Sequence, residues 1–476
     1  MGSFFSALTN NDQSRNQSKS PQVEACKRLR MSPSIHNHEN PRLIPTLPDE
    51  ISLQILARLP RTCYLSVKMV SRSWKAAIAS SELYQLRKEL GTTEEWLYIL
   101  TKEDEGKLCW HALDPINGRW QRLPPMPNLR HEEESKRGLR VLDLMGSGIK
   151  IADVIRSWLG RKDSLDRMPY CGCGIGAVSG CLYVLGGFSR ASTMKSVLKY
   201  DPCVNSWLEV SSMTTGRAFC KTSVLNSKLY VVGGVSRGRN GLAPLQSAEV
   251  YDPDTGLWDP VPSMPFSKAQ VLPTAFLAEL LKPIATGMTS YRGRLYVPQS
   301  LYSWPFFVDV GGEVFDPETN SWVDMPAGMG EGWPGRQAGT KLSVVVNGEL
   351  YAYALDPSSS LDRGKIKIYD HQEDSWKVVL GKVPVRDFTD SESPYLLAGF
   401  HGKLHVITKD INNEIAILQA DLPKHIDSDT ASSSSSTDSA SQDLDAAMES
   451  DIDIWRVIAA KSFNAAELIS CQVLNI

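Results

Sequence analysis

Short apolar runs of strand length recur along the chain from residue 96 onward, and each is bounded by glycine or by a polar turn. The two clearest read Gly180-Cys-Leu-Tyr-Val-Leu-Gly-Gly187 and Lys228-Leu-Tyr-Val-Val-Gly-Gly234, and weaker copies begin at Gly293, Gly348 and Gly402. Because these runs are short and rich in Val, Leu and Tyr, they predict strands that are buried on both faces.

A second signature follows the apolar runs: an Asp with a Trp six residues later, separated by turn-forming residues. An Asp turn between two strands makes a hairpin whose second strand starts at the Trp. The sequence therefore predicts one hairpin for each pair. The pairs are Asp114 with Trp120, Asp201 with Trp207, Asp252 with Trp258, Asp316 with Trp322, and Asp370 with Trp376.

The hairpins recur at a regular distance, which indicates a repeat architecture. With Trp455 as a sixth member, the spacing is about 50 residues once two insertions are set aside. The first is a helical insert at 130–168, whose apolar spacing predicts an amphipathic helix that packs on the repeats or binds a partner or membrane. The second is a Ser/Asp-rich disordered loop at 424–452.

A Gly-Gly pair, then Tyr-Asp-Pro, then Trp six residues after the Asp together resemble the kelch repeat. The segments 171–210 and 220–262 match well, whereas 287–325 and 340–380 lack the Gly-Gly pair. The resemblance implies a mainly β fold over 91–476, a six-bladed β-propeller with one four-stranded blade for each repeat.

The first repeat lacks a first strand, because it begins at Trp96-Leu-Tyr-Ile-Leu100. The apolar run at 467–475 is a strand left over after the last repeat. We expect this strand to complete the first blade and close the ring, since a closed ring has no open sheet edges.

Helical periodicity replaces strand periodicity at 43–90, after a polar tail, 1–42, whose composition predicts disorder. Apolar residues recur at helix spacing in three stretches that begin near Ile51, Val67 and Leu83. So short a segment is too small for a comfortable core of its own. Periodicity leaves two interpretations open: the helices cap the propeller, or they keep apolar surface for a partner.

In this segment Leu-Pro, Ile-Leu, Leu-Pro, Val and Trp follow one another in register and resemble the F-box. An F-box before kelch repeats is similar to the plant F-box/kelch-repeat proteins. The resemblance implies docking on a Skp-type adaptor, and through it on a cullin. Val70 and Trp74 fit either this docking face or the core of the module. The residues that the resemblance assigns to the adaptor face are Leu47, Pro48, Ile51, Ile55, Leu56, Leu59 and Pro60.

The function that the resemblance implies is substrate recognition in an SCF-type (Skp–cullin–F-box) ubiquitin ligase, with the propeller binding a target protein for ubiquitination. The alternative is a kelch scaffold or ligand-binding protein with a helical N-terminal cap. No Ser/His/Asp set, HExxH or P-loop pattern is visible, and the eight His do not cluster as copper ligands would. The sequence therefore predicts a non-catalytic protein with no cofactor and no metal.

Basic residues recur in the predicted loops, either before the first strand of a blade or after a Gly-Gly strand. Loops from both positions can line one mouth of the ring, where cations would bind an acidic or phosphorylated peptide. Solvated arginines and salt bridges between blades are the alternative. The candidate substrate-binding residues are Arg130, Arg190, Arg217, Arg237, Arg239, Arg336 and Arg386, and Lys268 occupies one further junction.

The net charge of −3 excludes a globally basic nucleic-acid binder, although the tail 1–42 is basic and the segment 421–454 is acidic. Nine Cys without a CxxC pair favour a reducing compartment, so we expect the cytoplasm or the nucleus. No apolar run is long enough to span a membrane. The start Met1-Gly2-Ser-Phe-Phe-Ser6 fits a myristoylation signal, so membrane binding would depend on lipidation of Gly2.

Overall fold

The structure is a computed structural model of the 476-residue chain. The insert 130–168, the loop 424–452, residues 1–41 of the tail and therefore Gly2 lie outside the residues that it describes. The chain divides into two compact units, Met1–Ile55 and Leu56–Ile476. The described residues are 42–103, 107–114, 116–127, 170–189, 192–238, 241–266, 284–303, 306–333, 343–355, 364–380, 395–409, 414–421, 454–463 and 466–476.

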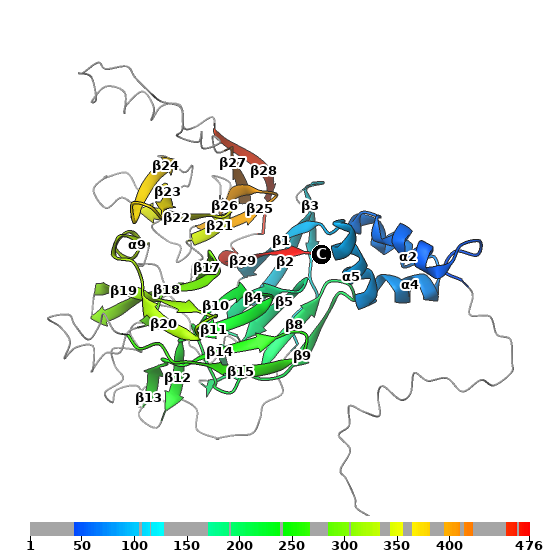
Figure 1. Cartoon of the computed structure of the whole chain (residues 1–476). Coiled ribbons are helices and arrows are strands. Elements are labelled where there is room, and N and C mark those ends of the chain that lie inside the picture. The colour runs from blue at the N-terminus through cyan, green and yellow to red at the C-terminus, as the bar shows by residue number, and fades with distance from the viewer. Residues whose placement is uncertain are drawn as a thin grey trace, which may run out of the picture. The chain divides into compact units, whose positions relative to one another are not determined.

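Most described strands belong to six antiparallel sheets, the blades of a six-bladed β-propeller (Figure 1). Within each blade the strands pair in order from the first to the fourth. Blade 1 is β29 (Glu467–Asn475), β1 (Glu95–Lys102), β2 (Leu108–Asp114) and β3 (Arg119–Arg122). Blade 2 is β4 (Gly174–Val178), β5 (Cys181–Leu185), β8 (Val197–Asp201) and β9 (Ser206–Val210). Blade 3 is β10 (Lys221–Leu225), β11 (Lys228–Val232), β14 (Ala248–Asp252) and β15 (Leu257–Val261).

The other three blades repeat the order, and the first strand of blade 4 is split in two. Blade 4 is β16 (Ile284–Ala285) and β17 (Thr289–Tyr291), both paired with β18 (Arg294–Ser303), then β19 (Phe306–Asp316) and β20 (Ser321–Asp324). Blade 5 is β21 (Ser343–Val346), β22 (Glu349–Leu355), β23 (Gly364–Asp370) and β24 (Ser375–Leu380). Blade 6 is β25 (Tyr395–Phe400), β26 (Lys403–Lys409), β27 (Ile415–Ala420) and β28 (Trp455–Lys461).

In the described part of the ring, three small elements lie outside these sheets. A hairpin of β6 (Phe188–Ser189) and β7 (Ser192–Thr193) joins the second and third strands of blade 2. A hairpin of β12 (Val235–Gly238) and β13 (Gly241–Pro244) has the same place in blade 3. The short helix α9 (Ala327–Gly332) follows blade 4.

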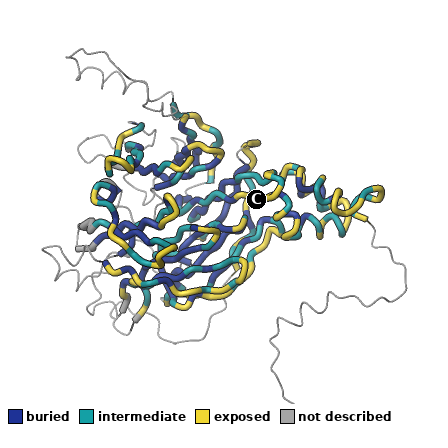
Figure 2. The backbone as a smooth tube through the Cα atoms, in the orientation of Figure 1, coloured by how far each residue is buried: buried dark blue, intermediate teal, exposed yellow. Residues whose placement is uncertain are grey.

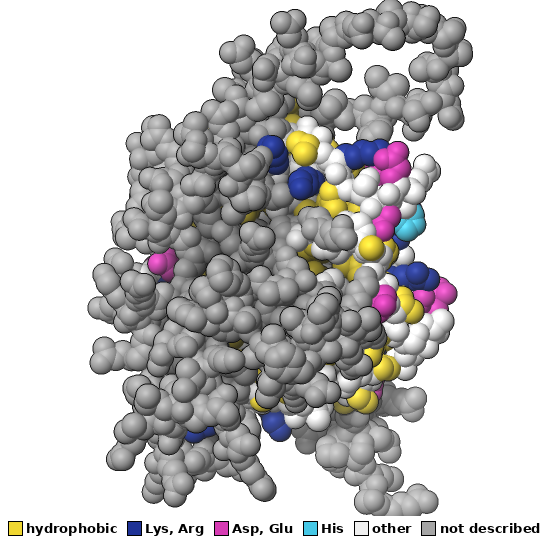
Figure 3. Space-filling model, turned by 90° about the vertical axis from the view of Figure 1, so that its left-hand side faces the viewer, with side chains coloured by type: hydrophobic (Ala, Val, Ile, Leu, Met, Phe, Trp, Pro, Cys, Tyr) yellow, Lys and Arg dark blue, Asp and Glu magenta, His cyan; other side chains and the backbone are white. Residues whose placement is uncertain are grey.

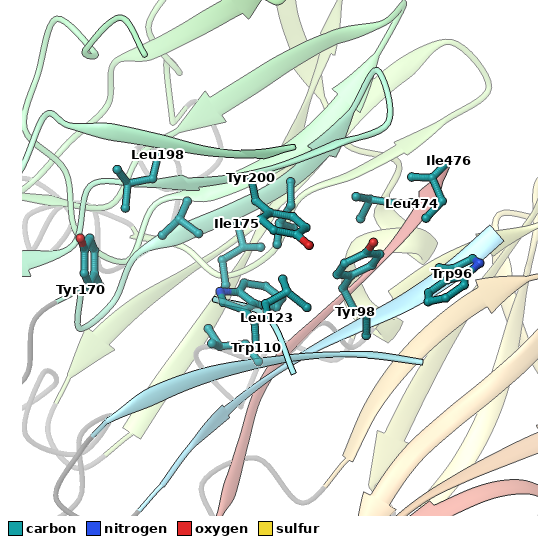
Figure 4. Close-up of a cluster of buried hydrophobic side chains, with 14 residues drawn as sticks. Trp96, Tyr98, Trp110, Leu123, Tyr170, Ile175, Leu198, Tyr200, Leu474 and Ile476 are labelled. Carbon is teal, nitrogen blue, oxygen red and sulfur yellow. The ribbon is translucent and has the colours of Figure 1, made fainter. Parts of the chain in front are cut away.

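The core of the ring lies between neighbouring blades, because successive side chains of a strand point to opposite faces of its sheet. On β1, Tyr98 and Leu100 pack against blade 2, whereas Leu97 and Ile99 pack against blade 6. Among the described residues, each of the six junctions holds one such apolar cluster. Figure 4 shows the junction of blades 1 and 2, where the rings of Tyr98 and Tyr200 meet.

Burial decreases from the inner strands of a blade to its fourth strand. Every residue of β5 is buried, whereas β9 has only exposed and half-buried residues (Figure 2). This gradient explains the continuous apolar runs of the second strands, since a strand between two other blades has no polar face.

In blades 2 to 5 the recurring Trp of the fourth strand joins the blade to the one before it. Trp207 donates its indole N–H to the carbonyl of Pro124 at 2.9 Å, and Trp258 donates to Ser211 at 2.8 Å. Trp322 and Trp376 donate to Pro262 and Met329 in the same way. The Trp is therefore a junction residue as well as part of a hairpin, which explains why it recurs in phase.

The Gly-Gly pairs of blades 2 and 3 make room for the link between these two blades. Gly186 has a φ of +57°, and a Cβ there would lie 2.2 Å from the carbonyl oxygen of Arg217. Gly234 has a φ of +81°, and a Cβ there would lie 2.5 Å from the carbonyl oxygen of Ala218. Both the positive φ and the close approach of another backbone require glycine.

The strand β29 is the first strand of blade 1, although it comes last in the chain. It pairs antiparallel with β1 from Glu95 opposite Asn475 to Lys102 opposite Glu467. On its other side the amide of Gln472 donates to the carbonyl of Ile175 in blade 2. The chain thus meets itself within one blade, so the ring has no open edge at this point.

The helical segment begins with α2 (Asp49–Ala57), which starts directly after Pro48 and ends three residues before Pro60. In the unit from Leu56 onward, the 3-10 turn η1 (Arg61–Cys63) is followed by α3 (Tyr64–Val67), α4 (Arg72–Ile78) and α5 (Ser81–Leu90). No helix in the described part of the chain is long and apolar enough to cross a bilayer.

Local sequence signals fix the ends of these helices. The hydroxyl of Ser71 accepts the N–H of Trp74 at the start of α4, and that of Ser80 accepts the N–H of Leu83 at the start of α5. Gly91, with a φ of +64°, ends α5 in the left-handed conformation.

Candidate interaction surfaces

On α2 the apolar residues divide between a surface and a core. Ile51 and Ile55, one helical turn apart, are 43% and 41% exposed. Pro48 and Pro60 are exposed, and Leu47 and Leu59 are half-buried. These six predicted adaptor-face residues thus keep at least part of their surface available to a partner.

Leu56, the seventh predicted residue, is fully buried. Its assignment to the adaptor face is therefore wrong in this conformation, and Leu56 belongs to the protein core. The physical reason is that a stripe at positions i, i+4 and i+5 is wider than one contact face. One edge of such a stripe can face inward while the other stays exposed.

Two exposed apolar residues near α3 are absent from the sequence-based assignment. Leu65 is 72% exposed and Met69 is 85% exposed, and Val70 beside them is 60% exposed. Tyr64 and Val67, in the same short segment, are buried. The signal was present in the sequence, because the run 64–70 holds five apolar residues and one helix face cannot bury them all. Val70, which fitted either face or core, lies on the surface.

The turns at one end of blade 2 contact these helices. Within an antiparallel blade, the first–second and third–fourth connections share one end, and the second–third connection and the links between blades share the other. Arg61 donates to the carbonyl of Pro202 at 2.6 Å, and Lys68 donates to that of Cys203 at 2.7 Å. Both acceptors lie in the turn between β8 and β9. The helices therefore contact the end of blade 2 that carries the turn between β8 and β9.

Arg217 lies in the link between blades 2 and 3, but it is fully buried and unavailable to a substrate. Its guanidinium donates to Glu249 on β14, with the shortest N–O distance at 2.6 Å, and to the carbonyls of Gly233 and Ser247. The prediction that Arg217 binds substrate is therefore wrong, and the alternative of a structural salt bridge applies to it.

The carboxylate of Glu249 is held in its charged form. Burial opposes that charge, but the Arg217 guanidinium and the backbone N–H of Thr214 outweigh it and keep the pKa of Glu249 below its usual value. The pair thus connects the link, the Gly-Gly strand and the third strand of blade 3.

Arg237 is exposed on β12, at the end of blade 3 opposite the β14–β15 turn. Its backbone N–H donates to the hydroxyl of Thr193 at 3.4 Å, and the hydroxyl of Ser236 lies 3.3 Å from the same group. The hairpins of blades 2 and 3 therefore lie side by side. The other predicted cations, Arg130, Arg190, Arg239, Lys268, Arg336 and Arg386, lie outside the described residues.

On the face drawn in Figure 3, Lys and Arg side chains are interspersed with Asp and Glu. In the part of the chain that the structure describes, no three His, Cys, Asp or Glu side chains are placed to hold a metal ion. None of the cysteines in these segments forms a disulfide bond.

Comparison with known proteins gives the family. The model of the F-box domain matches residues 44–86, and the model of the Kelch motif matches residues 169–214 and 216–265. The F-box/kelch-repeat protein At1g22040 of Arabidopsis thaliana is 62% identical over 477 residues, covering 100% of both chains. The chain belongs to the plant F-box/kelch-repeat proteins.

Other members of the F-box/kelch-repeat family are more distant. The F-box/kelch-repeat protein At1g30090 of Arabidopsis thaliana is 31% identical over 68% of this chain and 67% of its own. The two Kelch matches coincide with blades 2 and 3, whose Gly-Gly pairs are intact, and the F-box match runs from before α2 into α5. The family predicted from the sequence is confirmed.

Proposed function

We propose that this F-box/kelch-repeat protein is a substrate-recognition subunit of an SCF-type ubiquitin ligase. The helical segment docks on a Skp-type adaptor, and the propeller binds the target protein. Proteins with this combination are generally non-catalytic adaptors, so the contribution of the chain is proximity. It raises the effective concentration of the target near the ubiquitin-charged conjugating enzyme.

The observation that carries the proposal is the exposed apolar surface of the helical segment. Met69 and Leu65 are the most exposed large apolar side chains in the described part of the chain. They lie in a short run in which Tyr64 and Val67 face the core, so burial of the surface pair is left to a partner. Apolar side chains on one helical segment are the usual anchors of helix docking.

The alternative, a helical cap on a scaffold protein, is favoured by the contacts of Arg61 and Lys68 with blade 2. The two functions use different faces of the same helices, because these contacts leave Leu65 and Met69 exposed. A cap alone gives no reason for those two exposed residues. Docking on an adaptor accounts for both observations.

The experiment measures adaptor binding by the full chain with a purified Skp-type adaptor. The variant Leu65→Ala/Met69→Ala is expected to lose about tenfold in affinity, since truncating a central apolar anchor costs about 1–2 kcal/mol. Its thermal unfolding should not change, because both side chains are exposed.

The matched control is Leu208→Ala/Val378→Ala, which removes two exposed apolar side chains from fourth strands of the ring. This variant should bind the adaptor as the wild type does. A wild-type chain that binds no adaptor, or a Leu65/Met69 variant with unchanged affinity, would falsify the proposal.

A further inference from the structure

The helices are connected to the ring by a buried arginine on α5. Arg87 is 3% exposed, and its guanidinium donates to the carbonyl of Leu59 at 2.8 Å and to the hydroxyl of Tyr64 at 2.7 Å. It also donates to the carbonyl of Thr92 at 2.6 Å and to the carboxylate of Glu94 at 3.1 Å. The side chain of Arg87 therefore bonds to the residues that follow α2, to α3 and to the connection that leads into β1.

Glu94, the residue before β1, accepts hydrogen bonds from the helical segment and is itself part of the ring. One carboxylate oxygen accepts from the backbone N–H of Arg61 at 2.8 Å as well as from Arg87, and the other accepts from the indole of Trp96 at 3.2 Å. Its backbone exchanges both hydrogen bonds with Ile476, at 2.8 and 2.9 Å. Glu94 is thus bonded through its side chain to the helices and through its backbone to the strand that closes the ring.

Arg61 provides a second connection, to the neighbouring blade. Its guanidinium donates to the carbonyl of Pro202 and lies over the ring of Trp96, 5.7 Å from the centroid. Farther along, the hydroxyl of Tyr84 donates to the carbonyl of Asn475 at 3.3 Å. The helices therefore contact two blades, and a rotation about one contact would break the other.

The buried charge of Arg87 and the directionality of its hydrogen bonds make these contacts favour one orientation of the helices on the ring. Arg87 is buried, so an orientation that separated it from Glu94 would leave an unpaired charge out of water, which is strongly unfavourable. Hydrogen bonds also fix angles, whereas apolar surfaces can slide over one another. The group of Arg61, Arg87 and Glu94, which we call the polar join, is consequently suited to select one orientation.

We propose that Glu94 is a positioning residue that fixes helices α3 to α5 in one orientation on blades 1 and 2. The inference rests on the proposed function for its consequence. With the helices on the adaptor, this orientation sets where the ring presents its target. The geometry of presentation is then a property of this chain and not of a flexible linker.

The test measures the distance between the helices and the ring in the full chain. Spin labels are attached at Glu89 on α5 and Glu209 on β9, both exposed, through a ketone-bearing amino acid that leaves the nine cysteines unlabelled. Pulsed electron paramagnetic resonance of the otherwise wild-type chain should give one narrow distance distribution. Glu94→Ala should broaden it or add a second distance.

The control is Glu103→Ala, which removes a carboxylate from an exposed pair with Arg122 at 3.2 Å in blade 1. It should keep the narrow distribution. Glu94→Gln, which keeps the size of the side chain but loses its charge, should lie between Glu94→Ala and the wild type. If Glu94→Ala unfolds, Glu94→Gln carries the test by the same criterion. A narrow, unshifted distribution in the folded Glu94 variants would overturn the inference.

Adaptor affinity is measured separately with the same variants. Glu94 lies away from Leu65 and Met69 in sequence and is paired internally, so adaptor affinity should stay at the wild-type value. Failure of the wild type to bind the adaptor would contradict the proposed function and leave the distance measurement intact. A changed distance with unchanged adaptor affinity is the result that the positioning role predicts.

Discussion

The protein has two connections of different chemistry: one closes the ring, and the other joins the helices to the ring. At the junction of blades 6 and 1, which we call the seam, Leu97 and Ile99 of β1 pack with Leu396, Ile417 and Leu468. At the polar join, two arginines and one glutamate connect helices and ring through directional hydrogen bonds. The seam buries apolar area, and the polar join buries charge.

Because the two connections differ in chemistry, we expect one to set the stability of the ring and the other to set the orientation of the helices. Apolar burial contributes roughly 25 cal/mol for each Å² removed from water and does not depend on angle. A buried ion pair contributes little net stability, because desolvation offsets its attraction, but it penalises every arrangement that separates the charges. We therefore expect the seam to determine whether the ring folds and the polar join to determine how the helices are held.

The strongest test of this comparison is deletion of residues 467–476. The deletion removes β29, with the buried side chains of Leu468 at the seam and of Leu474 and Ile476 at the junction of blades 1 and 2. A fully buried aliphatic side chain contributes about 1.5–3 kcal/mol, so the loss is comparable with the whole stability of a domain, about 5–15 kcal/mol. Melting followed by circular dichroism should show loss of the cooperative transition.

The control for the deletion is Asn475→Ala, which changes an exposed side chain of the same strand. It should melt like the full chain. A truncated chain that also melted like the full chain would mean that β29 does not hold the seam.

A second test asks whether a buried ion pair inside the ring behaves like the polar join. Arg217→Met leaves the carboxylate of Glu249 buried without its partner and should cost about 3–5 kcal/mol in urea unfolding. Arg217→Met/Glu249→Leu removes both charges and should recover most of that loss. A double variant as unstable as the single one would show that the pair itself stabilises the ring, which would weaken the comparison.

The sequence was sufficient to predict the repeated parts of the ring. The apolar runs and the Asp-to-Trp interval depend on neighbours within one repeat, so each copy carries its own signal. The aspartate begins each turn by accepting backbone N–H groups two or three residues on, as Asp252 does from Asp254 and Thr255. Six blades and their order follow from such local rules.

Residues that act across long separations could not be assigned from the sequence. Arg217 precedes the first strand of a blade, as Arg130 and Arg336 do, but its partner Glu249 is 32 residues away in the blade that follows. Leu56 and Ile55 are adjacent apolar residues, and only the packed structure tells which one is buried. Arg87 falls at helix spacing among Leu83, Leu86 and Leu90, and one charge within such an apolar stripe is the sequence signal of a buried ion pair.

Two buried histidines at the seam are expected to make its stability sensitive to acid. His405 on β26 is 1% exposed and stacks on Phe400, with ring centroids 3.6 Å apart. His111 on β2 is 5% exposed, and its ring lies 4.2 Å from that of Phe463. Burial lowers the pKa of each histidine to about 4, well below the unfolded value of about 6.5.

The sign of the pH effect follows from these values. Between pH 6.5 and 4 the two histidines bind protons in the unfolded chain but stay neutral in the folded one. The stability that the neutral histidines contribute is therefore complete above the unfolded pKa and is lost as the pH falls towards 4. For His405 the difference corresponds to about 3 kcal/mol. His405→Phe should therefore reduce the fall in unfolding free energy between pH 7 and pH 4.5, measured in urea, while His371→Phe on an exposed turn should not. Equal falls in His405→Phe and the wild type would place the acid sensitivity elsewhere than at the seam.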